Sequence, residues 1–531
     1  MTRLLTILAV LAVVTGACAG APPSTTGGGT SPAPSAAAKP TYGGTVTFVL
    51  ENDVVDFDPL KSRAFVDRNI YYQIYDSLVR IDETGKIIAW LATKWEPSAD
   101  GKSVTFTLRD DVTYHDGTKF DADSVKWNIE RYIKTAGSQR AGELSSVDTV
   151  EVVNPTTVKF NLKSPFSPLV ANLVDRASMM VSRKAFEAIG NPDDFTRKAF
   201  KAGSGPFMIT EAIKDDHMTL EKNPSWWGKD KDGNKLPYLD KITVKPITNS
   251  DTRFTNLRTG DAQVSNNISG KDVPTARSES SLTYQERPAL SFRSLIPNRA
   301  AGFVFNDKRY VKAVALAIDR AQLLEKGYFN LGAVGYGTIA PAHFAFDASF
   351  KPFEKADPEA AKKLVQEVGK PLSFELLVSA GDPATLTIAT LIKDQLQKAD
   401  IVADIQQLEF AKILELQSAH TFKGLTFVGW SGRIDPDGNT YDHIYTKRPF
   451  NDSSYSNAEV DKLLDEQRAT SDQDKRKTAL RKAEQIYVVD DPARIWLGFG
   501  AAQLLTSKKV NAPPIYPDQI IRFQFMSMAA K

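Results

Sequence analysis

The feature that most constrains this chain is an export signal that ends beside a lone cysteine. Residues 1–3 are short and basic, residues 4–14 are mostly apolar and carry no charge, and small residues lead to Cys18. A charged, then an apolar, then a small-residue region is the order of a signal peptide. The apolar run is shorter than the roughly 20 residues that a membrane-spanning helix needs. We therefore predict that residues 1–17 are a signal peptide.

Cys18 is the only cysteine, so no internal disulfide can form and the fold must rest on packing. A cysteine directly after small residues resembles the lipidation motif of bacterial lipoproteins, although Thr15 stands where that motif usually has Leu, Val or Ile. On this interpretation Cys18 is the lipidated first residue of a protein anchored to the cell membrane, in the periplasm or on the outer face. The alternative is an ordinary signal peptide that ends near a cysteine.

Composition narrows the class of protein. The chain has 531 residues, 42% apolar and 24% charged, which suits two or three globular domains. The net charge of +2 and the lack of basic stretches interleaved with aromatic residues exclude nucleic acid as an expected partner. Residues 19–39 contain mainly Gly, Ser, Thr, Pro and Ala. Such a segment buries too little apolar surface to fold, so we predict a lipid-anchored, disordered linker over residues 18–41.

The first half of the folded sequence has the pattern of an α+β protein. We predict a strand over 44–50, a helix over 69–78, a hairpin over 95–112, a helix over 124–132 capped by Asp121 or Asp123, a strand pair over 147–162 and a strand over 242–247.

From residue 309 onward helices alternate with strands. The expected helices are 311–328, 357–368 with Asp357 as its cap, a helix ending at 399, 457–468 and 473–488, and the expected strands are 372–378 and 425–428. This alternation predicts a mostly parallel α/β region.

Enzyme signatures are missing from the sequence. It contains no GxSxG and no HExxH, and its five histidines are scattered. We therefore expect a protein that is not an enzyme and that holds no metal and no cofactor.

One loop carries residue types that suit ligand binding. The stretch GWSGRIDPDG, residues 429–438, follows a short apolar strand and ends in turn residues. Ligands of open α/β sheets bind outside the carboxyl ends of strands. Trp430, Ser431 and Arg433 would offer a stacking surface, hydrogen bonds and a charge. The alternative is that Trp430 belongs to the core and that Arg433 is a solvated loop charge.

Six segments carry a shared pattern: LATKWEPSADGKSVTFTLRDDVTYHDGTKFDADSVKWNIER at 91–131, VDFDP at 55–59, GSGPF at 203–207, EKNPSWW at 221–227, the helix end AIDR at 317–320 and DKLL at 461–464. Together and in this order they resemble one family, the extracellular solute-binding proteins of the peptide/nickel class (family 5) of ABC importers.

The resemblance implies a pear-shaped, two-lobed periplasmic-binding-protein-like fold, α/β with an α+β part, that closes by a hinge on a ligand in the cleft. Lobe I would comprise 42–298 plus 492–531, with a subdomain near 81–203, and lobe II would comprise 299–491. The closed form of a monomer would dock on a membrane permease whose paired ATPases drive import.

The resemblance also implies where the ligand binds. In the peptide-binding branch an aspartate after the GW pair holds the peptide's amino terminus, and here that position is Arg433, which suits a carboxylate, phosphate or electron-rich oxygen. Asp435 lies close enough in sequence to restore an amine partner. The dipeptide-binding members place an arginine early in the helix after Asp382, where this chain has Leu386 and Thr387. The predicted ligand-binding residues are Arg63, Phe65, Tyr336, Trp430, Ser431, Arg433 and Asp435.

These inferences predict the substrate-binding receptor of an ABC importer for a small solute, a peptide or a peptide-like and anionic molecule. An oligosaccharide or opine receptor of the same fold is the alternative, and a nickel chelate is disfavoured because the 429–438 loop has no histidine. A secreted hydrolase and a structural lipoprotein are the alternatives from other classes.

Overall fold

One long mixed sheet runs through the computed structural model, which describes residues 41–530. The predictions for the signal peptide, for Cys18 and for linker residues 18–40 lie outside the described residues. The strand order of the sheet is β15-β14-β16-β12-β17-β11-β1-β10-β9-β8, and β13 (Ala333–Val334) pairs with β17 beside this path.

The N-terminal part of this sheet is built around β1 (Thr45–Leu50). It pairs parallel with β10 (Lys241–Pro246) and with β11 (Val264–Ser265), which confirms the strands predicted over 44–50 and 242–247. Alternate residues Val46, Phe48 and Leu50 are buried in one core cluster, as the period of a half-buried strand requires. Beyond β10, β9 (His217–Lys222) and β8 (Phe207–Ile213) pair antiparallel.

A second, four-stranded sheet lies beside it, in the order β4 (Ala92–Pro97), β5 (Ser103–Leu108), β7 (Thr157–Leu162), β6 (Val147–Asn154). Helix α2 (Ala122–Lys134) shares a core with this sheet, and its cap is Asp121, whose side chain accepts a hydrogen bond from Ser124 N. The predicted hairpin, strand pair and helix are therefore confirmed.

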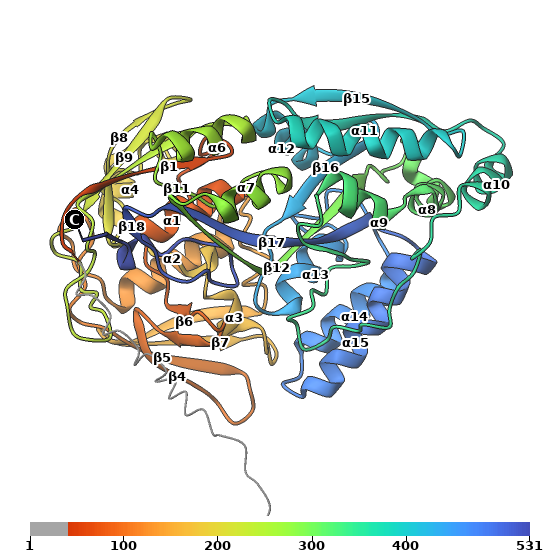
Figure 1. The fold of residues 1–531 in the computed structure, drawn as a ribbon. Helices are drawn as coiled ribbons and strands as arrows, with labels where there is room; N and C mark the ends of the chain where they lie inside the picture. The colour runs from red at the N-terminus through yellow and green to blue at the C-terminus, as the bar shows by residue number, and fades with distance from the viewer. Residues whose placement is uncertain (1–40, 531) are drawn as a thin grey trace, which may run out of the picture. The chain divides into compact units, whose positions relative to one another are not determined.

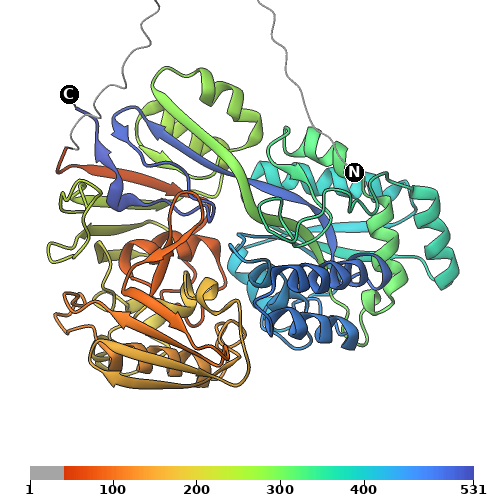
Figure 2. The ribbon, with the colours of Figure 1, turned by 90° about the horizontal axis from the view of Figure 1, so that it is seen from below.

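Two long antiparallel strands, β12 (Leu282–Pro297) and β17 (Ile495–Ser507), cross from one lobe to the other (Figures 1 and 2). We call residues 41–281 together with 508–530 lobe I, and residues 298–494 lobe II. The pairing of β12 with β17 shifts register between Pro288 and Phe292 and again between Arg293 and Ser294. Such bulges bend and twist a strand pair, so the crossing is locally irregular.

Lobe II contains the C-terminal strands of the sheet. β14 (Ser373–Ser379) pairs parallel with β15 (Val402–Leu408) and with β16 (Leu425–Trp430). β16 then pairs antiparallel with β12, so the predicted parallel arrangement holds for these three strands and not for the sheet that they join. The lobe II helices are α8 (Lys308–Ala317), α9 (Arg320–Gln322), α10 (Pro358–Val368), α11 (Pro383–Gln397), α12 (Phe410–Ser418), α13 (Pro436–Ile444), α14 (Ala458–Arg468) and α15 (Gln473–Gln485).

Lobe I contains further short elements. They are α1 (Phe65–Ile74), α3 (Leu169–Asn172), α4 (Arg183–Ala188), α5 (Phe195–Lys198), α6 (Ser250–Thr259), α7 (Val273–Ser278), β2 (Val79–Ile81), β3 (Ile87–Ala89), β18 (Val510–Asn511) and β19 (Ser527–Met528). In the part of the chain that the structure describes, we find no helix with the length and apolar character to cross a bilayer.

Two helix predictions need correction. The helix predicted over 69–78 is α1, which begins at Phe65 and ends at Ile74, where the Ile74 carbonyl accepts a hydrogen bond from Gly205 N. The helix predicted over 311–328 ends at Ala317, because the next residue is extended and Asp319 starts a new turn by accepting from Gln322 N. Gln395 of α11 holds the break through a 3.0 Å hydrogen bond to Asp319 N.

Candidate functional site

A cavity of about 390 Å³ lies where the two lobes and the crossing strands meet. Lobe I contributes residues that follow β1 and the start of α1, and lobe II contributes the end of β16 and the first turn of α11. The volume falls in the range of roughly 300–1,000 Å³ of small-molecule sites. The crossing strands supply Arg293 and Gln503 to the same wall.

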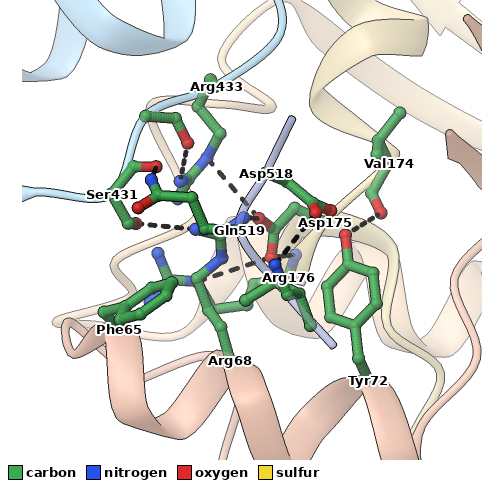
Figure 3. A network of polar contacts seen from close by, with 12 residues as sticks. Phe65, Arg68, Tyr72, Val174, Asp175, Arg176, Ser431, Arg433, Asp518 and Gln519 are labelled. Atoms are coloured by element: carbon green, nitrogen blue, oxygen red, sulfur yellow. Dashed lines mark hydrogen bonds and ion pairs between the residues drawn. The ribbon is translucent and has the colours of Figure 1, made fainter. Parts of the chain in front are cut away.

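Four of the seven predicted ligand-binding residues line this cavity: Arg63, Phe65, Trp430 and Ser431. Trp430 Nε1 donates to Asn439 Oδ1 at 3.1 Å, so the indole is fixed and presents only a small exposed area. Ser431 Oγ accepts from Arg68 Nη1 at 2.6 Å, which joins lobe II to lobe I beside the cavity (Figure 3).

Arg63 also connects the lobes. Its Nη2 forms an ion pair of 2.6 Å with Asp452 Oδ1, and Nη1 donates to Ser418 Oγ. Its guanidinium lies 5.0 Å from the centre of the Phe450 ring. Arg63 therefore lines the cavity with its charge already paired.

The other three predicted residues do not line the cavity. Tyr336 faces Arg320, whose guanidinium is 5.9 Å from the centre of its ring. Asp435 caps α13 and forms a bidentate ion pair with Arg476 at 2.7 and 2.8 Å. Asp435 is thus engaged inside lobe II, and the structure offers no amine site there.

Arg433 points away from the cavity and toward lobe I. Its guanidinium stacks 4.5 Å from the Trp430 ring and lies 3.8 Å from Asp175 Oδ2 and 3.9 Å from Glu143 Oε1. Burial lowers the pKa of Arg433 to about 10, with Asp175 acting in the opposite direction. Arg433 therefore fits neither interpretation of the sequence: it does not line the cavity as a ligand-binding residue, and it is not a solvated loop charge.

Asp175 is the centre of a buried network between the lobes (Figure 3). Arg68 pairs with it at 2.5 Å, and Arg176 and Arg433 lie at 3.8 Å. Burial opposes ionisation, yet Arg68, Arg433 and Arg176 together hold the pKa of Asp175 well below its usual range. Gln519 Nε2 adds a 2.9 Å bond to the Ser431 carbonyl. Charge and hydrogen bonds therefore tie the loop after β16 to lobe I.

The sequence profile of the bacterial extracellular solute-binding proteins, family 5, matches residues 86–452. The chain belongs to this family. The glutathione-binding protein GsiB of Escherichia coli K12 is 24% identical over 493 residues, which cover 90% of this chain and 93% of GsiB. As a family 5 protein, the chain is an extracytoplasmic solute-binding receptor of an ABC importer.

Solved structures show the same two-lobed fold. The oligopeptide-binding protein AppA of Bacillus subtilis, in complex with a nonapeptide, has a TM-score of 0.85 at 22% identity, covering 93% of this chain and 100% of that one. AgaA of A. tumefacien R10, in complex with agropinic acid, has a TM-score of 0.83 at 22% identity, covering 92% and 99%.

Sequence reasoning missed the charged residues that this family 5 cavity contains besides Arg63. They are Glu51, Arg253, Arg293 and Asp382. Glu51 follows β1, and Asp382 caps α11 by accepting from Thr385 N at 3.2 Å. Arg293 had a signal in the sequence, since it is a charged residue in the otherwise buried end of β12. That pattern indicates a charge held at a site, but it does not say which residues surround it.

The acidic wall of the cavity has one carboxylate oxygen without a partner. Burial raises the pKa of Glu51, Arg253 opposes that rise and Asp382 adds to it. Glu51 Oε2 is buried and has no hydrogen-bond partner among the described residues. Arg253 donates to the carbonyls of Ile247, Thr248 and Asn267 at 2.7 to 3.1 Å. Acidic side chains therefore outnumber basic ones here, with Glu51 and Asp382 beside Arg253.

No group of three or more His, Cys, Asp or Glu side chains within residues 41–530 is placed to hold a metal ion. The site offers side chains of both charges on different strands, with Glu51 after β1 and Arg293 on β12, together with an aromatic surface and hydrogen-bonding groups. This arrangement suits binding of a small molecule that carries both signs of charge.

Proposed function

We propose that this receptor captures a small peptide-like solute with a free amine and a free carboxylate. The observation that carries the proposal is the bipolar cavity, with the unpartnered oxygen of Glu51 on one wall and the guanidinium of Arg293 on another. A buried charge without a partner is costly, and a ligand of matching polarity removes that cost at both ends. The name of GsiB, a glutathione-binding protein, agrees with this class.

Lobe closure is the proposed mode of capture. Residues from both lobes line the cavity, so a ligand in contact with both favours the arrangement in which the lobes meet. We propose the hinge at the irregular pairing of β12 with β17, and lobe boundaries near residues 298 and 492. The lobes carry the ligand, as a monomer, to a membrane permease with its ATPases, and no step of catalysis is involved.

A second candidate ligand class is an opine-like acid. AgaA, which has the same fold, was solved in complex with agropinic acid. An acidic opine would also use the Arg293 wall, so the two candidates differ in what occupies the Glu51 wall.

A panel of ligands tests the proposed class. The purified full-length protein is heated with glutathione, di- to tetrapeptides, agropinic acid, neutral oligosaccharides and a nickel–histidine chelate. A ligand present at 100 times its Kd stabilises the native state by about 2.7 kcal/mol, which raises the melting temperature measurably. We expect shifts with glutathione or free peptides. A shift with agropinic acid alone favours the opine class, and a shift with neutral oligosaccharides alone contradicts the bipolar ligand.

Membrane attachment at Cys18 is a separate part of the proposal, supported by the sequence of the first 18 residues. We expect the wild-type protein to sediment with membranes and Cys18→Ala to appear in the soluble extracytoplasmic fraction. Equal partition of the two proteins would contradict lipidation at Cys18.

A further inference from the structure

The guanidinium of Arg293 has an unusual position on the crossing strands. Arg293 follows the buried Phe292 on β12, lies opposite Gly498 of β17, and sits between the two register shifts of this strand pair. Bulges next to binding sites re-aim side chains, and here the irregular pairing accompanies an arginine that lines the cavity.

Space around this guanidinium is provided by a glycine. A Cβ at Gly332 would come within 3.1 Å of Arg293 Nη1 and 2.3 Å of the Phe499 carbonyl oxygen. The guanidinium also lies 3.9 Å from the centre of the Tyr328 ring. The side chain therefore packs between close neighbours and stacks on an aromatic ring, which fixes its orientation.

The charge of Arg293 has no counter-charge in the described residues. No carboxylate of residues 41–530 forms an ion pair with it, and its only hydrogen bonds run from Nη1 to the carbonyls of Leu331 and Phe499, both at a long 3.4 Å. Nε and Nη2 donate to no atom of the described chain. Burial lowers the pKa of Arg293, which expresses the cost of this isolated charge.

Other buried arginines near the cavity differ from Arg293. Arg63 is paired with Asp452, and Arg253 donates to three carbonyls and lies near three carboxylates. Arg320 does not line the cavity, and it is saturated by four backbone carbonyls at 2.7 to 3.1 Å. Of these four, only Arg293 combines a place in the cavity wall with two nitrogens, Nε and Nη2, that donate to no atom of the described residues.

We propose that Arg293 is the anchor for a carboxylate of the ligand, which it holds in a bidentate contact through Nε and Nη2. Arginine is suited to this role because two parallel N–H donors match the two oxygens of a carboxylate. The inference rests on the proposed function, since it assumes a ligand with a free carboxylate. It assigns specificity to the crossing strands, whereas the sequence pointed to the loop at 429–438.

The test compares a peptide acid with its amide. Titration calorimetry measures binding of tri-alanine and of tri-alanine C-terminal amide to the wild-type protein, Arg293→Gln and Arg293→Lys. The matched control is Arg287→Gln, on the same strand, where Arg287 donates to the carbonyls of Glu83 and Ile515 outside the cavity. We expect the wild type and the control to prefer the acid about 10- to 100-fold, as a charge-assisted contact predicts.

Arg293→Gln should bind the acid as weakly as the amide, and Arg293→Lys should keep part of the preference because it keeps the charge and loses the fork. If Arg293→Gln prefers the acid as strongly as the wild type does, the anchor is elsewhere and the proposal is overturned.

A second measurement separates this proposal from the proposed function. If no peptide in the panel raises the melting temperature of the wild type, the proposed peptide class is wrong. The melting temperatures of the variants without ligand still test the role of Arg293. A ligand anchor is an uncompensated charge in the empty protein, so Arg293→Gln should melt at or above the wild-type temperature. A lower melting temperature than that of Arg287→Gln would make Arg293 a structural residue and overturn the proposal.

Discussion

The arginines at two places in this molecule have opposite surroundings. In the network between the lobes, Asp175 has Arg68 at 2.5 Å and Arg176 and Arg433 at 3.8 Å. In the cavity wall, no carboxylate of the described residues pairs with Arg293. Several cations thus share one anion at the first place, and one cation stands alone at the second.

The difference indicates that the two charged regions have different roles, one in holding the lobes together and one in binding the ligand. Charges that face each other across the lobes form ion pairs within the protein, so they stabilise the arrangement in which the lobes meet. A charge that faces the cavity must stay unsatisfied within the protein if a ligand is to satisfy it. The ligand then favours the same arrangement through the contacts that only it can complete.

The largest expected effect tests the paired region. Asp175→Asn leaves three buried arginines without their shared carboxylate, and a broken buried pair costs about 3–5 kcal/mol. The free energy of unfolding, measured by urea denaturation, should fall by that amount. The control is Asp193→Asn. Asp193 is 81% exposed and its partner Lys61 is 35% exposed, so losing this pair should lower the free energy of unfolding by less than about 1 kcal/mol. Equal losses for the two variants would contradict the network.

A second pair connects the lobes beside the cavity. Asp452 pairs with Arg63 at 2.6 Å and also supports the charge of the buried Arg494, whose pKa burial lowers to about 10. Asp452→Asn should therefore reduce the free energy of unfolding by about 2–3 kcal/mol. Because the Arg63 contact spans the lobes, ligand should also dissociate faster, and stopped-flow tryptophan fluorescence would measure that rate.

The control for this pair is Asp307→Asn, which loses an ion pair to the half-exposed Arg309 within lobe II. If Asp452→Asn lowers stability and leaves the dissociation rate unchanged, the pair supports the fold and not the meeting of the lobes.

A third prediction contrasts two acids of the same interface. The pKa of Asp175 is lowered, whereas burial raises the pKa of Asp442 to about 6, opposed by Arg468 and aided by Glu143. A folded pKa above the unfolded value of about 3.9 means that Asp442 contributes stability below pH 4 and loses it as pH rises through 6. The slope reaches about 1.4 kcal/mol per pH unit in that window.

The measurement is urea denaturation of the wild type and Asp442→Asn from pH 4 to pH 8. Asp56 and Asp67 have raised pKa values of about 8 and 6 and add slopes of the same sign, so the difference between the two proteins is the relevant quantity. We expect the free energy of unfolding of Asp442→Asn to increase relative to that of the wild type as pH rises from 4 to 6. A flat difference would mean that Asp442 ionises normally.

Local chemistry made much of the fold predictable. Asp121 and Asp357 cap the helices that they were predicted to cap, since a cap depends on neighbours within three residues. The break of the helix predicted over 311–328 was not predictable, because Gln395 of another helix holds it. Likewise, the parallel pairing of β14, β15 and β16 follows from the alternating pattern, whereas the antiparallel neighbour β12 comes from far along the chain.

The site was less predictable, for a geometric reason. Sequence spacing put Trp430, Ser431 and Arg433 in one loop, but it did not determine which way each side chain points. Arg433 turns toward Asp175 and Glu143, more than 250 residues earlier in the chain, while Trp430 faces the cavity. Arg293 acquires its role only from the walls that β17 and Tyr328 place around it.

The smallest expected effect separates the two arginines directly. Arg433→Gln removes ion pairs of 3.8 and 3.9 Å, but Asp175 keeps Arg68 at 2.5 Å and Glu143 keeps Arg140 at 2.9 Å. No carboxylate is stranded, so the free energy of unfolding should fall by about 1 kcal/mol or less. Arg433 stacks behind Trp430 and does not line the cavity, so ligand affinity should change by less than about threefold.

Calorimetry of Arg433→Gln and Arg293→Gln with the same acid and amide peptides would show which arginine binds the carboxylate of the ligand. Arg293→Gln should lose the preference for the acid, and Arg433→Gln should retain it, because of the two residues only Arg293 lines the cavity. The reverse result would require the loop after β16 to turn Arg433 toward the ligand, away from Asp175. In that case Arg433→Gln would weaken binding of the acid about 10- to 100-fold. Arg433 would then be the residue that contacts the ligand, and Arg293 would have a structural role.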